Sequence, residues 1–326
     1  IYPLSLHDAL PISTQLFNRV WNDSRLPDEA LLAIVRPLLK KGGSDNKVED
    51  TRPISLTSCL LKLFERVVHA RITRIAEQRG LLHDEQSGFR RLRRIEDNLF
   101  TLSVLLDTRQ RSQTFIAFLD IKKAYDTVWR DALLTRLHRQ GIRGRLWMLL
   151  RAMYRRVASV VQSDQDEAWF ETETGLKQGS VLSPVLFNLL IDELIEHLNQ
   201  TGLGVKLGDR KLACLLFADD VLLIADSADE LQQLLDVAAQ FAEQWLMRFN
   251  ASKSAVIVFG FNRSDCLQQE WKLGTASINR TDKYVYLGVT LTEGGEWRAQ
   301  AAKLAGAARN AAEKLSVAGI VGPLTK

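Results

Sequence analysis

The chain contains 326 residues, of which 46% are hydrophobic and 25% are charged, and its formal net charge is +4 with a pI near 8.9. This length is enough for two or three lobes with buried cores, and the composition excludes a disordered chain. Frequent polar breaks leave no apolar stretch long enough to cross a bilayer, so we expect a soluble protein with no membrane partner. The three cysteines, Cys59, Cys214 and Cys266, lack metal-ligand or paired spacing, which indicates a reducing, intracellular environment.

The two ends of the chain look unlike the rest of a folded protein. The segment PLSLHDALPIS, residues 3–13, resembles the translation of a common sequencing adapter. We therefore expect residues 1–13 to be an artefact that contributes nothing to the fold. The sequence stops abruptly after GPLTK, which favours a fragment of a longer protein.

The first half of the chain predicts one long helix and one buried strand. Apolar residues recur at helical spacing over 55–80, and Gly80 is typical of the residue that follows a helix end. The run TFIAFLD over 114–120 is apolar almost throughout and ends on Asp120. That pattern predicts a buried strand.

The second half opens with a helix and a hairpin. Over 183–202, Ser183 is placed to cap a helix and Pro184 to occupy its first position. The apolar runs 212–217 and 221–225 predict two buried strands joined by a tight turn.

A third helix and two further strands complete the pattern. Ser227 and Glu230 form a capping box in front of an apolar stripe that ends near Phe249. The runs 254–260 and 283–291 predict strands. Because strands and helices are mixed without strict alternation, we expect an α+β fold in which an antiparallel sheet is backed by helices.

Two adjacent aspartates, Asp219 and Asp220, stand at the predicted turn of LLFADDVLLIA. Aspartate is a favoured turn residue, so a plain hairpin tip is one interpretation. A metal site is the other, because two like charges held close together raise each other's pKa unless a cation lies between them.

A third carboxylate favours the metal site. Asp120 ends its own predicted strand, and if that strand lies beside the hairpin, then Asp120, Asp219 and Asp220 form one acidic cluster. Three carboxylates on rigid strands suit Mg²⁺, and two ions about 4 Å apart would stabilise both oxygens of a phosphoryl transfer. We expect two Mg²⁺ ions at this cluster, with Mn²⁺ as the alternative.

Two arginine clusters are basic enough to bind a phosphate backbone. One is the run RRLRR over 90–94, and the other lies within 143–156. A solvated surface is the more common reason for such runs. The clusters therefore count only as supporting evidence for a nucleic-acid interface, and the main evidence must come from other residues.

Seven blocks resemble, in the same order, those of the reverse transcriptases of non-long-terminal-repeat (LINE-type) retrotransposons. The blocks are DTRPISL (50–56), EQSGFRRLRRIEDN (85–98), FLDIKKAYD (118–126), GLKQGSVLSPVLFNLLIDEL (175–194), FADD (217–220), NASKS (250–254) and YLGVTL (286–291). Each block is weak evidence alone, whereas seven in family order are highly specific.

The resemblance implies an RNA-directed DNA polymerase with a right-hand fold. Residues 14–113 would form the fingers and the start of the palm, 114–292 the palm with its catalytic aspartates, and 293–326 a truncated start of a helical thumb. With a partial thumb, we expect weak synthesis from this chain alone. The implied substrates are an RNA template, a DNA primer and deoxyribonucleoside triphosphates.

The resemblance also implies roles for individual residues. Asp120 and Asp219 would share the two metal ions, Asp220 would support their placement, and Lys253 would protonate the leaving pyrophosphate. The implied nucleotide-binding residues are Ile121, Lys122, Lys123, Ala124, Tyr125, Gln178, Gly179, Arg52 and Lys40 or Lys41. The implied nucleic-acid contacts are Arg90, Arg91, Arg93 and Arg94. Tyr125 stands where the family usually carries phenylalanine, as the aromatic gate against a 2′-hydroxyl.

Three other classes of protein compete with this interpretation. Tyr125 and Ala218 argue against a viral RNA-copying polymerase, and Phe217 argues against a group II intron protein. An inactive remnant that only binds RNA is the alternative from a different functional class. If the family assignment is right, the chain belongs to a longer polyprotein with an endonuclease or other domains, which acts as an intracellular ribonucleoprotein in the nucleus or cytoplasm.

Overall fold

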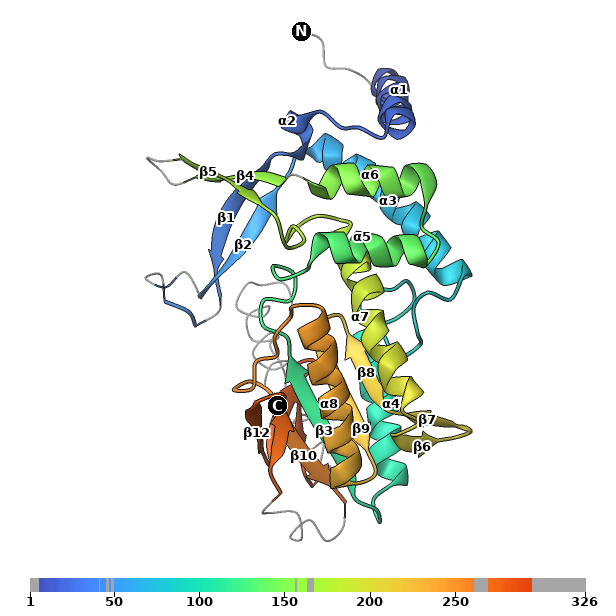
Figure 1. Ribbon diagram of the computed structural model, residues 1–326, viewed down its shortest axis with the longest axis vertical. Helices are drawn as coiled ribbons and strands as arrows, with labels where there is room; N and C mark the ends of the chain where they lie inside the picture. Colours follow the sequence, from blue (N-terminus) through green and yellow to red (C-terminus); the bar gives the residue numbers. More distant parts are fainter. Residues whose placement is uncertain are drawn as a thin grey trace, which may run out of the picture. The chain divides into compact units, whose positions relative to one another are not determined.

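The computed structural model describes residues 6–40, 42–44, 47, 50–155, 157–162, 167–260 and 269–294. They fold as two compact units built from interleaved stretches of the chain (Figure 1). Among the described residues, unit 1 contains those up to 92 together with 121–197 and 240–248, and unit 2 contains those within 93–120, 198–239 and 249–294. The lobes expected from the sequence, with bounds at 113 and 292, remain a prediction, and residues 295–326 of the expected thumb lie outside the described residues.

Unit 1 combines a four-stranded sheet with helices. The sheet order is β2-β1-β4-β5, with β1 (Ala33–Leu39), β2 (Thr51–Leu56), β4 (Val157–Gln162) and β5 (Glu167–Thr172). Strand β1 is antiparallel to β2 and parallel to β4, while β5 is antiparallel to β4. The helices are α1 (Leu6–Asp23), α2 (Asp28–Leu31), α3 (Cys59–Gln78), α5 (Arg130–Arg139) and α6 (Gly144–Arg155).

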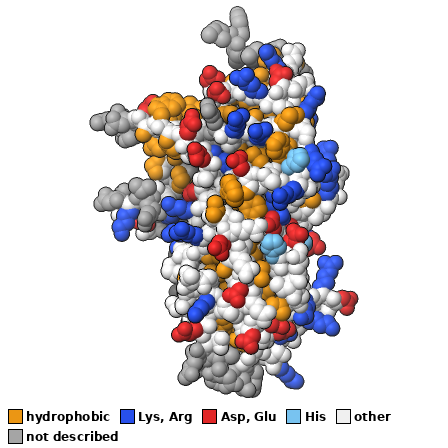
Figure 2. Space-filling view, in the orientation of Figure 1, with side chains coloured by type: hydrophobic (Ala, Val, Ile, Leu, Met, Phe, Trp, Pro, Cys, Tyr) orange, Lys and Arg blue, Asp and Glu red, His pale blue; other side chains and the backbone are white. Residues whose placement is uncertain are grey.

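The pairing of these strands places residues of all four strands on one face of the sheet. Val35 pairs with Ser55, Ala33 with Ser159, and Ser159 with Phe170. Directly paired residues share a face, and residues two apart on one strand share it too. This face lines a cavity of unit 1. The edge strand β5 also exposes Trp169, and Figure 2 shows hydrophobic side chains gathered over this sheet.

The long predicted helix is confirmed as α3. The Ser58 hydroxyl accepts a hydrogen bond from the Leu61 amide at 3.1 Å, which caps the first turn. Helix α1 packs on α3, because the rings of Phe17 and Phe64 lie 5.1 Å apart. Residues 6–13, which we expected to contribute nothing, are helical and extend α1, with Leu10 and Ile12 exposed.

Unit 2 is organised around a six-stranded sheet of order β11-β12-β10-β3-β9-β8. Its strands are β3 (Thr114–Asp120), β8 (Cys214–Phe217), β9 (Asp220–Ala225), β10 (Ala255–Phe259), β11 (Trp271–Leu273) and β12 (Ala276–Arg280). Two hairpins accompany it, β6 (Val205–Leu207) with β7 (Arg210–Leu212), and β13 (Lys283–Tyr286) with β14 (Val289–Thr292). Helix α4 (Ile95–Thr108) contacts β8.

The centre of this sheet is buried on both faces, as predicted. Along β3, Ile116 and Phe118 belong to a core that includes Leu102 of α4, while the alternate residues Phe115 and Ala117 are buried as well. The expected antiparallel palm sheet is confirmed, with one parallel pair at its side, where β10 pairs with β12. Antiparallel pairing holds from β8 through β9 and β3 to β10.

The stretch 283–291 is a hairpin rather than the single strand that we predicted. Leu287 and Gly288 form its two-residue loop, and both have positive φ, at 48° and 81°. Two-residue loops of this kind require positive φ and favour glycine. Gly288 within the apolar run 283–291 was therefore a turn signal, which the strand-like pattern on both sides of it made easy to overlook.

Helices α7 (Ser183–Gln200) and α8 (Ala228–Gln244) each contribute residues to both units. Ser183 was expected to cap α7, but its hydroxyl donates to the Lys177 carbonyl at 2.8 Å. At α8 the Ser227 hydroxyl accepts from the Glu230 amide, while the Glu230 carboxylate accepts from the Asp226 amide. The Ser227 half of the predicted capping box is thus formed, whereas the return bond of Glu230 goes to Asp226 instead of Ser227.

Among the helices that the structure describes, none combines the length and apolar character that a bilayer crossing requires. Cys214 is buried in β8 and Cys59 is exposed at the start of α3, whereas Cys266 lies outside the described residues.

Candidate active site

A tight hairpin holds the two adjacent aspartates of unit 2. Phe217 pairs with Asp220, so Ala218 and Asp219 are the two central residues of the turn between β8 and β9. Ala218 has φ 56°, the positive value that the first central position of such turns requires. Its side chain is nevertheless buried, which fixes the tip against the unit 2 core.

The third aspartate lies directly across the sheet. Asp120, the last residue of β3, pairs with Asp220, the first residue of β9, so both side chains leave the same face. The Asp120 main chain is held from the NASKS segment, whose Asn250 amide donates to the Asp120 carbonyl at 2.7 Å. The Asp120 amide in turn donates to the Ser254 hydroxyl at 3.2 Å. The structure therefore brings Asp120 and the hairpin together, as predicted.

The electrostatics of this cluster are those of crowded carboxylates. Partial burial and then the charges of Asp219 and Asp120 raise the pKa of Asp220 to about 6. Burial, Asp220 and Asp120 likewise raise the pKa of the Tyr284 phenol, whose ring stacks on Phe118 with 4.4 Å between centroids. Like charges that disfavour each other's ionised form are relieved by a divalent cation, and oxygen ligands suit Mg²⁺. The donor set thus fits such an ion.

The carboxylates are not gathered into a preformed metal centre. Within the described part of the chain, no group of three or more His, Cys, Asp or Glu side chains has the arrangement needed to hold a metal ion.

Lys253 lies on the turn that supports Asp120. Its amide donates to the Asn250 carbonyl at 3.0 Å, and its carbonyl accepts from the Tyr284 hydroxyl at 3.1 Å. The Lys253 side chain is exposed. The turn therefore fixes the main chain of Lys253 and leaves its ammonium group in solvent.

The expected nucleotide-binding segment forms a tight turn in unit 1. Lys123 has φ 52°, and its carbonyl accepts from the amides of Asp126 at 2.9 Å and Thr127 at 3.1 Å. Ile121 and Ala124 are buried, while Lys122 and Lys123 are exposed.

The next residue of this segment, Tyr125, is half-buried. Its ring stacks on Phe187 of α7, with centroids 5.1 Å apart and planes 22° apart. Its carbonyl accepts from the Leu176 amide at 2.7 Å. The Tyr125 ring is thus held by stacking on Phe187, and its main chain is held by the hydrogen bond from Leu176.

Gln178 and Gly179 dock on the edge of β2 in unit 1. The Ser55 amide donates to the Gln178 carbonyl at 2.7 Å. Gly179 has φ 111°, and a Cβ there would lie only 2.8 Å from the Ser55 carbonyl oxygen. Only glycine permits this approach without displacing backbone. The sequence could suggest a turn at Gly179, but the contact with Ser55 depends on a partner far away in the chain.

Two charged residues that we did not predict hold the segment on either side of Gln178. Glu65 of α3 is buried, and its carboxylate accepts from the Ser180 hydroxyl and the Val181 amide, both at 2.9 Å. Burial raises the pKa of Glu65 despite these bonds. A signal was present, because Glu65 occupies the i+4 position from Leu61 on the apolar stripe of α3.

Arg130 is the second of these residues and gave no signal in the sequence. Its buried guanidinium donates to four acceptors of the 172–175 segment, which are the carbonyl oxygens of Thr172, Thr174 and Gly175 and the Thr172 hydroxyl. Burial lowers the pKa of Arg130. A guanidinium carries five donors in a rigid fork, which suits a clamp on carbonyl oxygens.

The buried ammonium of Lys177 should make the free energy of unfolding depend on pH. Its ammonium donates to the Leu31 carbonyl at 2.6 Å, and burial lowers its pKa to about 8, with Glu65 opposing and Arg130 reinforcing the shift. Because the folded pKa lies below the unfolded one, folding is favoured as pH rises through this range. We expect the free energy of unfolding to gain about 2 kcal/mol from this lysine between pH 7.5 and 9.5.

Urea unfolding of the wild type and Lys177→Met at these two pH values measures the contribution. The wild type should gain this increment relative to the variant. Equal pH responses of the two proteins would contradict a depressed pKa, whatever the variant does to stability at a single pH.

The expected fingers residues are placed unevenly. Arg52 of β2 is exposed and pairs with Leu38 of β1. The Lys40 amide donates to the Asp50 carbonyl at 2.7 Å, which closes the segment between the two strands. Lys41 lies outside the described residues.

The first arginine cluster does not present all its members to solvent. Arg90 donates bidentately to Glu77, at 3.0 and 2.8 Å, and also donates to the carbonyls of His83 and Gln86. Its side chain is only 8% exposed. The donors of Arg90 are thus already used to brace the loop, and a contact with nucleic acid would compete with these bonds. Arg91 and Arg94 are exposed and Arg93 is half-buried.

A comparison of Arg91 with Arg90 tests whether the exposed Arg91 binds phosphate while Arg90 braces the loop. If Arg91 contacts phosphate, Arg91→Gln should reduce the slope of log affinity for primer–template against log salt by about 0.9, the contribution of one phosphate contact. Arg90→Gln should instead lower the melting temperature and leave the slope unchanged. Fluorescence anisotropy over a salt series measures both slopes. An unchanged slope in Arg91→Gln would make that arginine part of a solvated surface.

The second arginine cluster is partly engaged within the protein. The Arg145 guanidinium donates to the Asn22 side-chain oxygen at 3.1 Å, and that of Arg151 lies 5.6 Å from the centroid of the Trp147 ring. Arg156 lies outside the described residues.

Comparison with known proteins identifies the family of this chain. A family model described as reverse transcriptase (RNA-dependent DNA polymerase) matches residues 39–291. The retrovirus-related Pol polyprotein from the type-1 retrotransposable element R2 of Popillia japonica is 32% identical over 239 residues, or 71% of this chain and 32% of that protein. The RNA-directed DNA polymerase from mobile element jockey of Drosophila funebris is 28% identical over 295 residues, or 87% of this chain and 31% of that protein.

This chain thus spans about a third of the length of those relatives. Among solved structures, apo telomerase from Candida tropicalis truncated from its C-terminal domain superposes with a TM-score of 0.55 at 13% identity. The match covers 82% of this chain and 54% of that one, and it confirms the right-hand polymerase fold. The matches to the mobile elements confirm the resemblance to non-long-terminal-repeat reverse transcriptases. The chain belongs to the reverse transcriptase (RNA-dependent DNA polymerase) family.

Proposed function

We propose that this chain is the polymerase portion of an RNA-directed DNA polymerase, which extends a DNA primer along an RNA template. The observation that carries the proposal is the cross-strand pairing of Asp120 with Asp220, beside the hairpin tip that holds Asp219. Family membership supports it, since the match runs through all three aspartates. In the reaction the primer 3′-hydroxyl forms a bond to the α-phosphorus of the nucleotide, and the bond to pyrophosphate breaks.

The aspartates would hold two Mg²⁺ ions, or Mn²⁺ in their place. When bound, such ions stabilise the charge on the attacking and leaving oxygens. Asp120 and Asp219 would each serve both ions, and Asp220 would support their placement. The exposed ammonium of Lys253, on the turn that braces Asp120, would give a proton to the departing pyrophosphate.

Residues of unit 1 would bind the incoming nucleotide. The turn over 121–124 would lie along the triphosphate, which its exposed Lys122 and Lys123 side chains suit. Tyr125 would pack against the sugar, and Gln178 and Gly179 against the nucleotide and template pair. Arg52, with Lys40 or Lys41, would hold the outer phosphates. Arg91, Arg93 and Arg94 would contact the nucleic-acid backbone.

The whole protein would carry further domains. The curated relatives are about three times as long as this chain, which leaves room for an endonuclease or other activities. We further propose that it works inside the cell, in the nucleus or cytoplasm, as a ribonucleoprotein with its template RNA.

Primer extension tests the proposed activity directly. The chain is incubated in excess over a poly-rA template annealed to oligo-dT, with labelled dTTP and Mg²⁺ or Mn²⁺. We expect incorporation that depends on the template and on the divalent ion. Tight binding of the primer–template without incorporation under either ion would favour the alternative, an element remnant that only binds RNA.

A further inference from the structure

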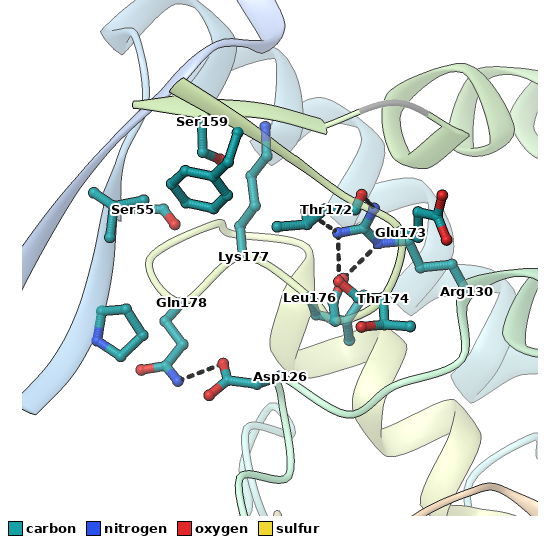
Figure 3. A pocket seen from close by; sticks show the side chains of 14 residues that line it. Ser55, Asp126, Arg130, Ser159, Thr172, Glu173, Thr174, Leu176, Lys177 and Gln178 are labelled. Carbon is teal, nitrogen blue, oxygen red and sulfur yellow. Dashed lines mark hydrogen bonds between the residues drawn. The ribbon is translucent and has the colours of Figure 1, made fainter. Parts of the chain in front are cut away.

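We propose that Asp126 is a positioning residue for nucleotide binding, because it holds the Gln178 amide in one orientation. The inference rests on the proposed role of Gln178 at the nucleotide and deepens it. Gln178 Nε2 donates to Asp126 Oδ1 at 2.9 Å, across 52 residues of sequence and within unit 1. Figure 3 shows this bond at the edge of a cavity, with the amide oxygen of Gln178 turned away from Asp126.

The chemistry of the pair decides which atom of the amide is presented. An amide group has a donor side and an acceptor side of nearly equal shape, so its orientation follows from its partners. A carboxylate offers only acceptors, which obliges the NH₂ group of Gln178 to face Asp126. The carbonyl oxygen Oε1 is therefore the atom left for a substrate donor, such as a sugar hydroxyl or a base amine.

Main-chain hydrogen bonds fix the backbone of both partners. Only the side-chain torsions of Gln178 then remain to be fixed, and the bond to Asp126 fixes them. Asp126 donates its amide to Lys123 within the tight turn, and the Ser55 amide holds the Gln178 carbonyl at 2.7 Å. Arg130 clamps the approach to Gln178, with its Nε donating to the Gly175 carbonyl at 2.6 Å. With the backbone set, a flexible glutamine still loses side-chain entropy when it binds, and Asp126 removes that cost beforehand.

The cavity beside the pair gives the amide room to move when its partner is removed. Its volume is about 320 Å³, and Val35, Ser55 and Phe170 line it from the four-stranded sheet. A glutamine released from Asp126 has space to adopt other rotamers here. Loss of the carboxylate should therefore disorder Gln178 rather than collapse the unit.

The same cavity supplies a matched control. Glu173 also lines it and is exposed, and the hydrogen bond to Gln178 belongs to Asp126. Glu173→Ala removes one carboxylate from the same space as Asp126→Ala does. Any effect of net charge on a triphosphate should appear in both variants, whereas an effect through Gln178 should appear only in the second.

Single-turnover incorporation of one nucleotide, with the chain in excess over primer–template, measures nucleotide affinity and the maximal rate separately. We expect Asp126→Ala to weaken apparent nucleotide affinity about tenfold and to change the maximal rate less than twofold. Asp126→Asn allows both amide orientations, so it should weaken affinity about threefold. Glu173→Ala should match the wild type. In a Gln178→Ala background, Asp126→Ala should cost nothing further.

Three results would overturn the inference alone. They are wild-type affinity in Asp126→Ala, an equal loss in the presence and absence of Gln178, and a fall in maximal rate together with the melting temperature. The last two would show that Asp126 acts through its own contacts or through the fold. A wild-type chain that incorporates nothing would overturn the proposed function, and the inference with it. The two failures are therefore distinguishable.

Discussion

Asp219→Asn is expected to reduce DNA synthesis at least a hundredfold, about 2.7 kcal/mol in the barrier, while primer–template affinity changes less than twofold. The substitution keeps the size of the side chain at the hairpin tip, so the β8–β9 turn should survive. What disappears is one of the negative charges that a pair of divalent ions requires. Nucleic-acid binding relies on basic residues elsewhere, so the loss should fall on the chemical step.

The measurement is steady-state primer extension together with anisotropy binding of the same duplex. Asp209→Asn is the matched control, because Asp209 is an exposed aspartate in the β6–β7 turn of the same unit. It removes the same charge without touching the paired strands and should leave synthesis unchanged. A residual rate above about a tenth of wild type in Asp219→Asn would contradict the metal assignment, as would an equal loss in the control.

The parts of this site that the sequence predicts are those set by local pattern. Asp120 ends an apolar run, and Asp219 and Asp220 interrupt another, so the apolar runs and turn chemistry alone place them at strand ends. Their pairing across β3 and β9 needed one further assumption, that the two runs are neighbours. Buried strands of matching length made that assumption a natural one, and the register confirms it.

The parts that local pattern misses are set by distant partners. Arg130 looks like the first residue of an ordinary helix, yet its guanidinium holds carbonyl groups more than forty residues away. Arg90 reads as one of four similar arginines, and only its contact with Glu77 separates it from Arg91. Neither distinction is written in propensity or spacing, because both depend on which backbone groups tertiary folding brings within reach.

Tyr125→Val is expected to raise incorporation of ribonucleotides relative to deoxyribonucleotides at least tenfold, about 1.4 kcal/mol of discrimination. The ring is half-buried and stacks on Phe187, which is itself fully buried, so Tyr125 has a rigid support beneath it. A supported ring under the sugar would reject a 2′-hydroxyl by steric clash, and Val is too short to reach. Use of deoxyribonucleotides should fall only modestly.

The competing view is that Tyr125 serves only to pack against Phe187. Cutting a core aromatic to Val would then leave a cavity that costs roughly 3 kcal/mol of stability and lowers both activities together. Tyr125→Phe keeps the ring and should keep the wild-type ratio, which separates the ring from its hydroxyl. Phe187→Leu weakens the support without shortening the gate, so it should lower the melting temperature with a smaller change in the ratio. An unchanged ratio in Tyr125→Val with a lower melting temperature would make Tyr125 a packing residue, and deoxyribonucleotide selection would then need another residue.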